Sequence, residues 1–206
     1  MIVIVDYQSA GNPNSIKNML KHIGVEAVIS NKTDDIEKAD KLILPGIGAF
    51  DSGIKNLHDS GLISILSHKV VVGKTPILGI CLGMQLFTRK SEEGSALGLG
   101  WIDAETIRFN FGEMVGERDR IPHMGWNSVT FVQNNPLYQH IVEPRFYFAH
   151  SYHVSDINQK SILTTTLYGY EFASSFAEEN IMGVQFHPEK SHKFGMKLLE
   201  NFVECY

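Results

Sequence analysis

The chain has 206 residues, of which 43% are hydrophobic, a length that can bury one sizeable core, so we expect a single domain over residues 1–206. Its net charge of -5, with no cluster of Lys or Arg, argues against a surface for nucleic acid or for an anionic membrane. No apolar run reaches the roughly 18 residues of a spanning helix, and the start, "MIVIVDYQ", reads as a mature first strand rather than a leader.

The first half of the chain alternates between strand and helix patterns. Short apolar runs of the kind found in parallel strands covered on both faces occur at Ile2–Asp6, Ala27–Ser30, Lys41–Pro45 and Thr75–Ile80. Between and after them, apolar residues recur at helical spacing after a cap at Asn14 or Ser15, over Ser52–Leu66 and over Leu82–Arg89. This order predicts an α/β fold with a central, mostly parallel sheet flanked by helices.

After about Gly100 the pattern changes to β-rich segments divided by polar or Gly/Pro turns. The last apolar strand is expected at Ile181–Phe186, and a closing helix is expected at about Ser191–Glu204. The prediction is therefore one domain with a β-rich second half.

The segment "TPILGICLGMQLF" holds Cys81 between a predicted strand and a predicted helix, with Gly79 and Gly83 on either side. This spacing is that of a nucleophile elbow with Cys in place of Ser. A helix N-terminus favours the thiolate over the thiol. A small buried cysteine packed beside two glycines is the structural alternative. The only other cysteine is Cys205, so no disulfide framework is expected, and a lone functional thiol suits the reducing cytoplasm.

A base and its orienting group are available in "GVQFHPEKS". In an extended segment His187 and Glu189 project to the same side, so Glu189 can hold the imidazole while His187 moves protons to and from Cys81. Chemistry in parallel sheets gathers at the carboxyl ends of strands, where both motifs are expected. A solvated surface turn is the alternative for this motif alone.

A third motif, "LILPGIGAF", ends a predicted strand in a turn whose backbone N–H groups can face a developing oxyanion. It lacks the third glycine of a dinucleotide loop and the Gly-Lys-Ser/Thr of a phosphate loop. The histidines are scattered and the cysteines are far apart, so no metal site is expected. No organic cofactor is expected either.

Taken together, Gly-Ile-Cys-Leu-Gly-Met-Gln, Pro-Gly-Ile-Gly and His-Pro-Glu, in this order, resemble the class I (triad) glutamine amidotransferases. The segments "PHMGWN", "YFAHSYHV" and "HPEKS" are more narrowly similar to the glutaminase subunits of imidazole glycerol phosphate synthases. The likeness extends over essentially the whole chain. It implies hydrolysis of glutamine to glutamate and ammonia through Cys81, His187 and Glu189.

The resemblance also implies roles for other residues. The glutamine and oxyanion site would be formed by Gly46, Gly48, Leu82, Gln85, Ser151 and Tyr152. The face toward a partner would carry Trp126, Tyr147 and Lys190. The implied partner is a (β/α)8 barrel synthase that receives ammonia through a protected channel and uses it in histidine biosynthesis. The loop Asp6–Asn12 is one residue longer than the usual Asp-Tyr-Gly-x-Gly-Asn of this family. In the family this loop lies on the side that faces the synthase, so the resemblance implies the same place here.

Three other functions are considered. A paralogous glutaminase would supply ammonia for sugar amidation in surface polysaccharides, and the long first loop motivates this alternative. A non-catalytic binding module would not need the intact triad. A cysteine peptidase of similar fold is disfavoured because Gln85 and Pro-Gly-Ile-Gly suit a free amino acid rather than a polypeptide.

Overall fold

The computed structural model describes residues 1–8, 11–112 and 120–206. Its largest sheet has 8 strands in the order β2-β1-β3-β4-β12-β11-β10-β7. The strands from β2 to β12 run parallel, and β11, β10 and β7 continue the sheet antiparallel. Their bounds in that order are Ala27–Ser30, Ile2–Val5, Lys41–Gly46, Ile77–Cys81, Ile181–Val184, Tyr170–Glu178, Ile162–Tyr168 and Thr130–Phe131.

Strand β1 shows why this sheet needs helices on both faces. All of its residues are buried, and their side chains alternate between two separate cores. Val3 and Val5 belong to one core, whereas Ile2 and Ile4 belong to the other. A strand without a polar face is stable only when both faces are covered.

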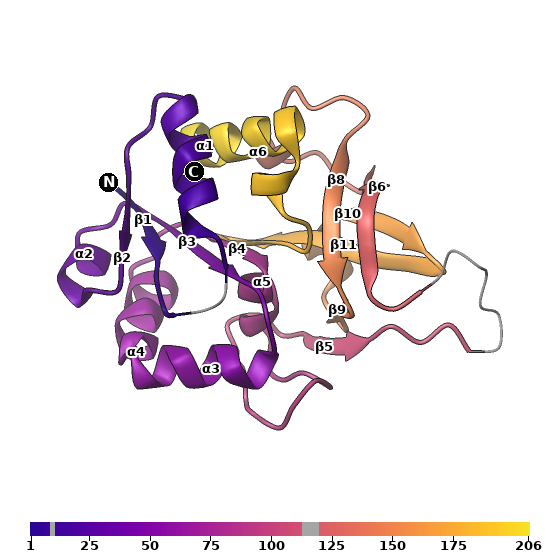
Figure 1. Ribbon diagram of the computed structural model, residues 1–206, viewed down its shortest axis with the longest axis horizontal. Coiled ribbons are helices and arrows are strands. Elements are labelled where there is room, and N and C mark those ends of the chain that lie inside the picture. The colour runs from indigo at the N-terminus through magenta and orange to yellow at the C-terminus, as the bar shows by residue number, and fades with distance from the viewer. Residues whose placement is uncertain (9–10, 113–119) are drawn as a thin grey trace.

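Helices supply that cover, and Figure 1 shows α1 and α6 on one side of the sheet and α3 and α4 on the other. Leu57 of α3 and Leu66 of α4 pack with Val3 and Val5, and Leu20 of α1 and Leu198 of α6 pack with Ile4. The α-helices span Pro13–His22 (α1), Thr33–Glu37 (α2), Phe50–Asp59 (α3), Leu62–Ser67 (α4), Leu82–Leu86 (α5) and His192–Cys205 (α6). Shorter helical turns lie at His68–Val72 (η1), Pro136–Tyr138 (η2), Gln159–Ser161 (η3) and Pro188–Lys190 (η4).

The second half adds two small antiparallel sheets beside the large one. One pairs β5 (Glu105–Arg108) with β9 (Tyr152–Ser155), and the other pairs β6 (His123–Ser128) with β8 (Arg145–His150). The predicted α/β class, the central and largely parallel sheet and the β-rich second half are all confirmed.

Three helical segments differ from the boundaries expected from sequence. The stretch Ser52–Leu66 belongs to two helices, α3 and α4, which are separated at Gly61, where φ is 70°. Helix α1 is capped by Asn12, whose side chain accepts from the Ser15 amide, because Pro13 is suited to the first helical position. Helix α5 ends at Leu86 rather than at Arg89. The Thr88 hydroxyl and amide both bond to the Gln85 carbonyl, which tightens the last turn and stops the helix.

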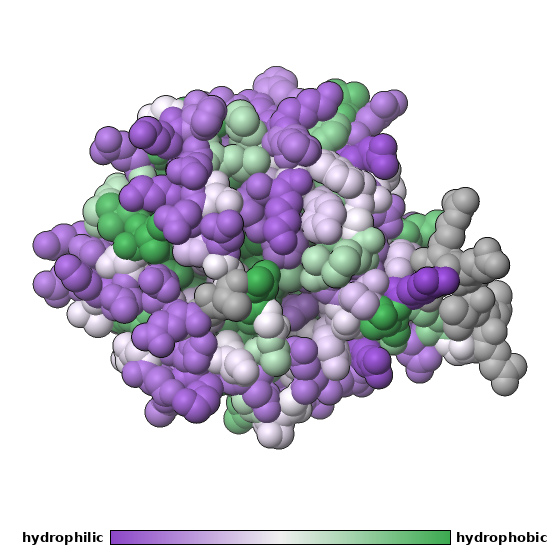
Figure 2. Space-filling view, in the orientation of Figure 1, coloured by the Kyte–Doolittle hydropathy of each residue, from purple (hydrophilic) through white to green (hydrophobic). Residues whose placement is uncertain are grey.

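The surface is mixed in character. Figure 2 shows hydrophobic side chains in small separate groups among hydrophilic ones on this face. Among the described residues, no helix is both long enough and apolar enough to cross a membrane.

The packing of α6 gives a test of the core. Leu198 is fully buried, so we expect Leu198→Ala to lower the free energy of unfolding by about 2–5 kcal/mol through lost burial and a residual cavity. Leu167→Ala is the matched control, because that side chain is 68% exposed and its loss leaves no cavity. Urea denaturation measures both, and equal effects would contradict this placement of α6.

Candidate functional site

The centre of the site is a sharp turn at the end of β4. Cys81 is the last residue of β4 and immediately precedes α5, and its backbone has φ 52° and ψ -109°. A positive φ in a residue other than glycine costs on the order of 1–3 kcal/mol and persists only where surrounding packing imposes it. The turn leaves Cys81 only 5% exposed, in the wall of a cavity.

Glycines on both sides make the turn possible because the backbone packs too closely for side chains. A Cβ on Gly79 would lie 2.5 Å from the Phe87 ring and 2.7 Å from the Met84 amide nitrogen. On Gly83 a Cβ would lie 1.8 Å from the Leu44 carbonyl oxygen of β3. The predicted strand–turn–helix geometry at Cys81 thus follows from close packing of α5 against the sheet.

His187 lies beyond the end of β12, where the chain leaves the large sheet. Strand β12 ends at Val184, two residues before the predicted Phe186, and the His187 amide donates to the Tyr147 carbonyl of β8 at 2.8 Å. The η4 turn then follows, and His187 Nδ1 lies 2.8 Å from Glu189 Oε1. The expected contact between the two side chains is present, but a helical turn makes it rather than an extended segment.

The two side chains are nearly sealed from solvent, with 1% of His187 and 5% of Glu189 exposed. Burial lowers the pKa of His187, but hydrogen bonding and charge from Cys81, together with those from Glu189, outweigh it and raise this pKa to about 10. The other ring nitrogen, Nε2, is buried and has no hydrogen-bond partner of normal geometry among the described residues. It is the ring nitrogen that is not engaged by Glu189 and is free to interact with Cys81.

A cavity of about 390 Å³ opens beside the Cys81 sulfur. This size suits a small molecule rather than a polypeptide. Of the six residues expected to bind substrate, all but one line it, namely Gly48, Leu82, Gln85, Ser151 and Tyr152. Gly46 is instead buried in β3, paired in register with Cys81, where a Cβ would meet the Tyr7 hydroxyl at 2.2 Å. It supports the floor of the site and does not line the cavity.

The side chain of Gln85 is fixed by two hydrogen bonds that its amide nitrogen donates. Nε2 donates to the Tyr152 carbonyl at 3.0 Å and to Gln185 Oε1 at 3.2 Å. Both amide hydrogens are thereby used, which leaves the Gln85 oxygen to accept from a ligand in the cavity.

The three residues expected at a partner face lie together on one side of this site. Trp126 and Tyr147 are paired across β6 and β8, with ring centroids 6.3 Å apart, and Lys190 Nζ lies 5.7 Å from the centre of the Tyr147 ring. Trp126 also stacks on His192 at 5.5 Å and is 40% exposed. Ser9 and Ala10 of the long first loop lie outside the described residues.

Sequence reasoning missed several residues of the cavity: Ile47, Ala49, Glu93, Pro122, Met124, Ala149 and His150. Pro122, Met124, Ala149 and His150 occur within the quoted segments "PHMGWN" and "YFAHSYHV", which were the available signal. Glu93 had none. Its carboxylate accepts from the Phe50 amide at the start of α3, a contact between distant segments.

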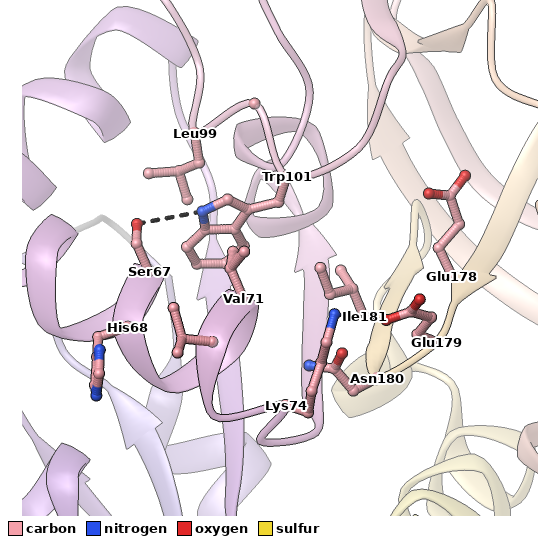
Figure 3. Close-up of a pocket in the computed structure, with 12 residues that line it drawn as sticks. Ser67, His68, Val71, Lys74, Leu99, Trp101, Glu178, Glu179, Asn180 and Ile181 are labelled. Atoms are coloured by element: carbon pink, nitrogen blue, oxygen red, sulfur yellow. Dashed lines mark hydrogen bonds and ion pairs between the residues drawn. The ribbon is translucent and has the colours of Figure 1, made fainter.

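A larger cavity of about 600 Å³ lies elsewhere, among Ser67, Lys74, Trp101, Glu179 and Ile181 (Figure 3). It borders the amino end of β12, whereas Cys81 is at the carboxyl end of the parallel strand β4. The indole nitrogen of Trp101 in its wall donates a hydrogen bond to the Ser67 hydroxyl at 3.3 Å. We place the chemistry in the smaller cavity because that one holds the thiol. Among the described residues, no group of three or more His, Cys, Asp or Glu is arranged to hold a metal.

The chain is similar to known proteins over almost its whole length. Residues 3–205 match the family model for class-I glutamine amidotransferases. The chain is 56% identical to the imidazole glycerol phosphate synthase subunit HisH 2 of Methanococcus maripaludis, covering 99% of each chain. It is 48% identical to the subunit of the same name from Pseudomonas aeruginosa, again over 99% of each.

The chain belongs to the class-I glutamine amidotransferases, in the HisH family. The resemblance drawn from sequence is therefore confirmed. A solved crystal structure of a glutamine amidotransferase, 18% identical in sequence, has a TM-score of 0.74 to this fold, with 99% of this chain and 98% of that chain covered. That likeness concerns the fold of the family alone.

The raised pKa of His187 is testable by NMR titration of its imidazole. We expect protonation up to about pH 10 in the native protein. In Glu189→Gln the midpoint falls by about one pH unit or more, because the carboxylate that favours the charged ring is lost. Glu200→Gln is the control, since Glu200 pairs with Lys197 on α6. A midpoint that is the same in Glu189→Gln as in the control would contradict the pairing.

Proposed function

We propose that this chain is the glutaminase subunit of an imidazole glycerol phosphate synthase. It would hydrolyse glutamine to glutamate and ammonia and pass the ammonia to a (β/α)8 barrel synthase in histidine biosynthesis. The observation that carries the proposal is one cavity lined by Cys81 and Gln85, behind which His187 and Glu189 are hydrogen-bonded at 2.8 Å. The names of the similar chains support the histidine pathway and do not favour sugar amidation for polysaccharides.

The first half-reaction forms a thioester. The Cys81 thiolate attacks the side-chain carbonyl carbon of glutamine, and the C–O π electrons move onto oxygen. His187 then donates its proton to the amide nitrogen as the C–N bond breaks, which releases ammonia and leaves glutamyl-Cys81. Because its pKa is raised, the imidazole remains protonated until the amide nitrogen becomes basic as the C–N bond breaks.

The second half-reaction reverses these roles. Neutral His187 takes a proton from water, and the hydroxide attacks the thioester carbonyl. The C–S bond then breaks, which gives glutamate and the thiolate with a protonated imidazole again. Glu189 stays ionised throughout and orients the ring through Nδ1.

The cavity supplies the groups that such a reaction needs. The Leu82 amide, at the start of α5, and the Gly48 amide are the proposed oxyanion donors, and Gly46 supports that strand end from below. The Gln85 oxygen and the Glu93 carboxylate suit the α-ammonium group of glutamine, and Ser151 and Tyr152 suit its carboxylate end. No described residue in the wall points to a cofactor requirement.

The proposed partner surface is the face with Trp126, Tyr147 and Lys190. An exposed indole and a phenol are typical of the centre of an interface, and Lys190 adds a positive charge beside the Tyr147 ring. Tyr147 connects this face to the base, because its carbonyl accepts from the His187 amide. A protected route for ammonia has a chemical reason, since free ammonia at neutral pH is mostly protonated and no longer nucleophilic.

We also propose that residues 1–206 act as a single domain in the cytoplasm. Both cysteines are free thiols, and a reducing compartment keeps the nucleophile active.

Loss of the nucleophile tests the division of labour. We expect Cys81→Ala, assembled with the barrel synthase, to lose glutamine-dependent activity by at least about 10³-fold. Activity with added ammonium salts should remain, because the barrel needs only ammonia. Cys205→Ala is the matched control, as that thiol is exposed and far from the cavity. Loss of both activities in Cys81→Ala would argue against separate sites.

The two other triad members should not be equivalent. His187→Ala should reduce glutamine hydrolysis more than Glu189→Ala, by about tenfold or more, because only His187 transfers the proton. Steady-state release of glutamate by the assembled complex measures this difference. Equal losses would assign Glu189 a larger role than orientation.

A further inference from the structure

Gln185 lies between β12 and His187, and neither triad chemistry nor substrate binding accounts for it. Its side chain is fully buried, although a polar amide at such a position is costly unless it is hydrogen-bonded. Its Nε2 lies 3.7 Å from the Cys81 sulfur, and its Oε1 lies 3.2 Å from Gln85 Nε2. It thus touches the nucleophile directly.

The hydrogen-bond network fixes which end of this amide faces the sulfur. The Tyr152 carbonyl can only accept, so the nitrogen of Gln85 must point toward it. The second hydrogen of that nitrogen then points to Gln185, whose oxygen must accept it. The remaining end of Gln185, facing Cys81, is consequently an N–H donor.

The Tyr152 carbonyl, where this series of hydrogen bonds begins, also accepts from a second donor. His150 Nδ1 lies 2.8 Å from the Tyr152 oxygen and must therefore carry the hydrogen. Burial lowers the pKa of His150 well below its ordinary value, so the ring stays neutral and donates from this nitrogen alone. Its Nε2 accepts from His123 Nδ1 at 3.0 Å. The Tyr152 carbonyl is thus fixed, and with it both glutamines.

We propose that the side-chain amide of Gln185 donates a hydrogen bond to the Cys81 thiolate and so stabilises the nucleophile in its ionised state. This inference deepens the proposed function and rests on it. The opposite contact of the sulfur is with the Ala149 carbonyl, at 4.0 Å, which can bond only to a protonated thiol. Gln185 is therefore the neutral group that favours the thiolate against that carbonyl.

An amide is suited to this role because it has no proton to lose. In the proposed cycle the thiolate is accompanied by protonated His187, and Gln185 adds to the same sulfur a second donor that carries no charge. Gln185 keeps its donor throughout. The other titratable groups around the sulfur are His187 with its partner Glu189, the neutral His150, and Glu93 and Tyr152 in the cavity wall. None of these replaces a fixed neutral donor.

The test measures the rate of Cys81 alkylation by iodoacetamide as a function of pH. Cys205 is exposed and would also react, so all proteins carry Cys205→Ser. In Gln185→Met, which keeps the side-chain length and removes the donor, we expect the profile to move by about one pH unit to higher pH, a roughly tenfold slower reaction on its rising limb. Gln133→Met is the matched control, because that amide donates only to the Lys160 and Ile162 carbonyls.

A folded Gln185→Met protein whose profile coincides with that of the control would overturn the proposal. If Gln185→Met does not fold, NMR of the native chain decides. The Gln185 side-chain N–H signals should shift with the same pH midpoint as the alkylation rate and should lose that response in Cys81→Ser. Signals that do not follow ionisation of Cys81 would equally overturn it. Neither measurement uses glutamine, so absent glutaminase activity would count against the proposed function and leave this result distinct.

Discussion

The close approach of α5 to the sheet is the constraint on which the site depends. Gly79 and Gly83 allow the backbone to pack where any side chain would collide, and the chain can then reverse from β4 into α5 only through a positive φ at Cys81. The cost of that conformation is offset by two cores that bury the strand on both faces. Without this packing, the sulfur would have no fixed position at the sheet edge.

The other groups reach the sulfur because several strands end at the same edge. Strands β3 and β4 pair so that Gly46 faces Cys81, and β12 continues toward β8 so that His187 is hydrogen-bonded to Tyr147. The same strand β8 pairs with β6, which carries Trp126. The proposed partner face and the base thus share one piece of backbone. If the proposed partner binds at that face, it contacts the backbone that positions His187.

Charged and neutral groups are divided around the nucleophile. His187 and Glu189 form a buried pair to which we assign proton transfer, whereas Gln85, Gln185 and the Tyr152 carbonyl form a neutral hydrogen-bonded network. Burial keeps His150 neutral, so its Nε2 can accept from His123 while its Nδ1 donates to the Tyr152 carbonyl. A charged His150 would add an unpaired charge to a region that already holds the paired imidazolium of His187. In the proposed cycle the His187–Glu189 pair gains and loses a proton, whereas the neutral network keeps its hydrogen bonds.

The sequence by itself determined the local features. The alternation of apolar runs and helical spacing predicted the parallel sheet, and the glycines beside Cys81 predicted the turn, because these signals depend on near neighbours. The motifs also predicted part of the cavity wall, including Gln85, Ser151 and Tyr152. What only the tertiary structure decided were contacts between distant segments. Glu93 against Phe50, Gly46 beneath the cavity instead of in its wall, and Gln185 against Cys81 all depend on how strands pack and pair. Even the His187–Glu189 contact arises from a turn whose start is set by pairing with β8. No periodicity encodes such contacts, since they follow from three-dimensional packing and not from spacing along the chain.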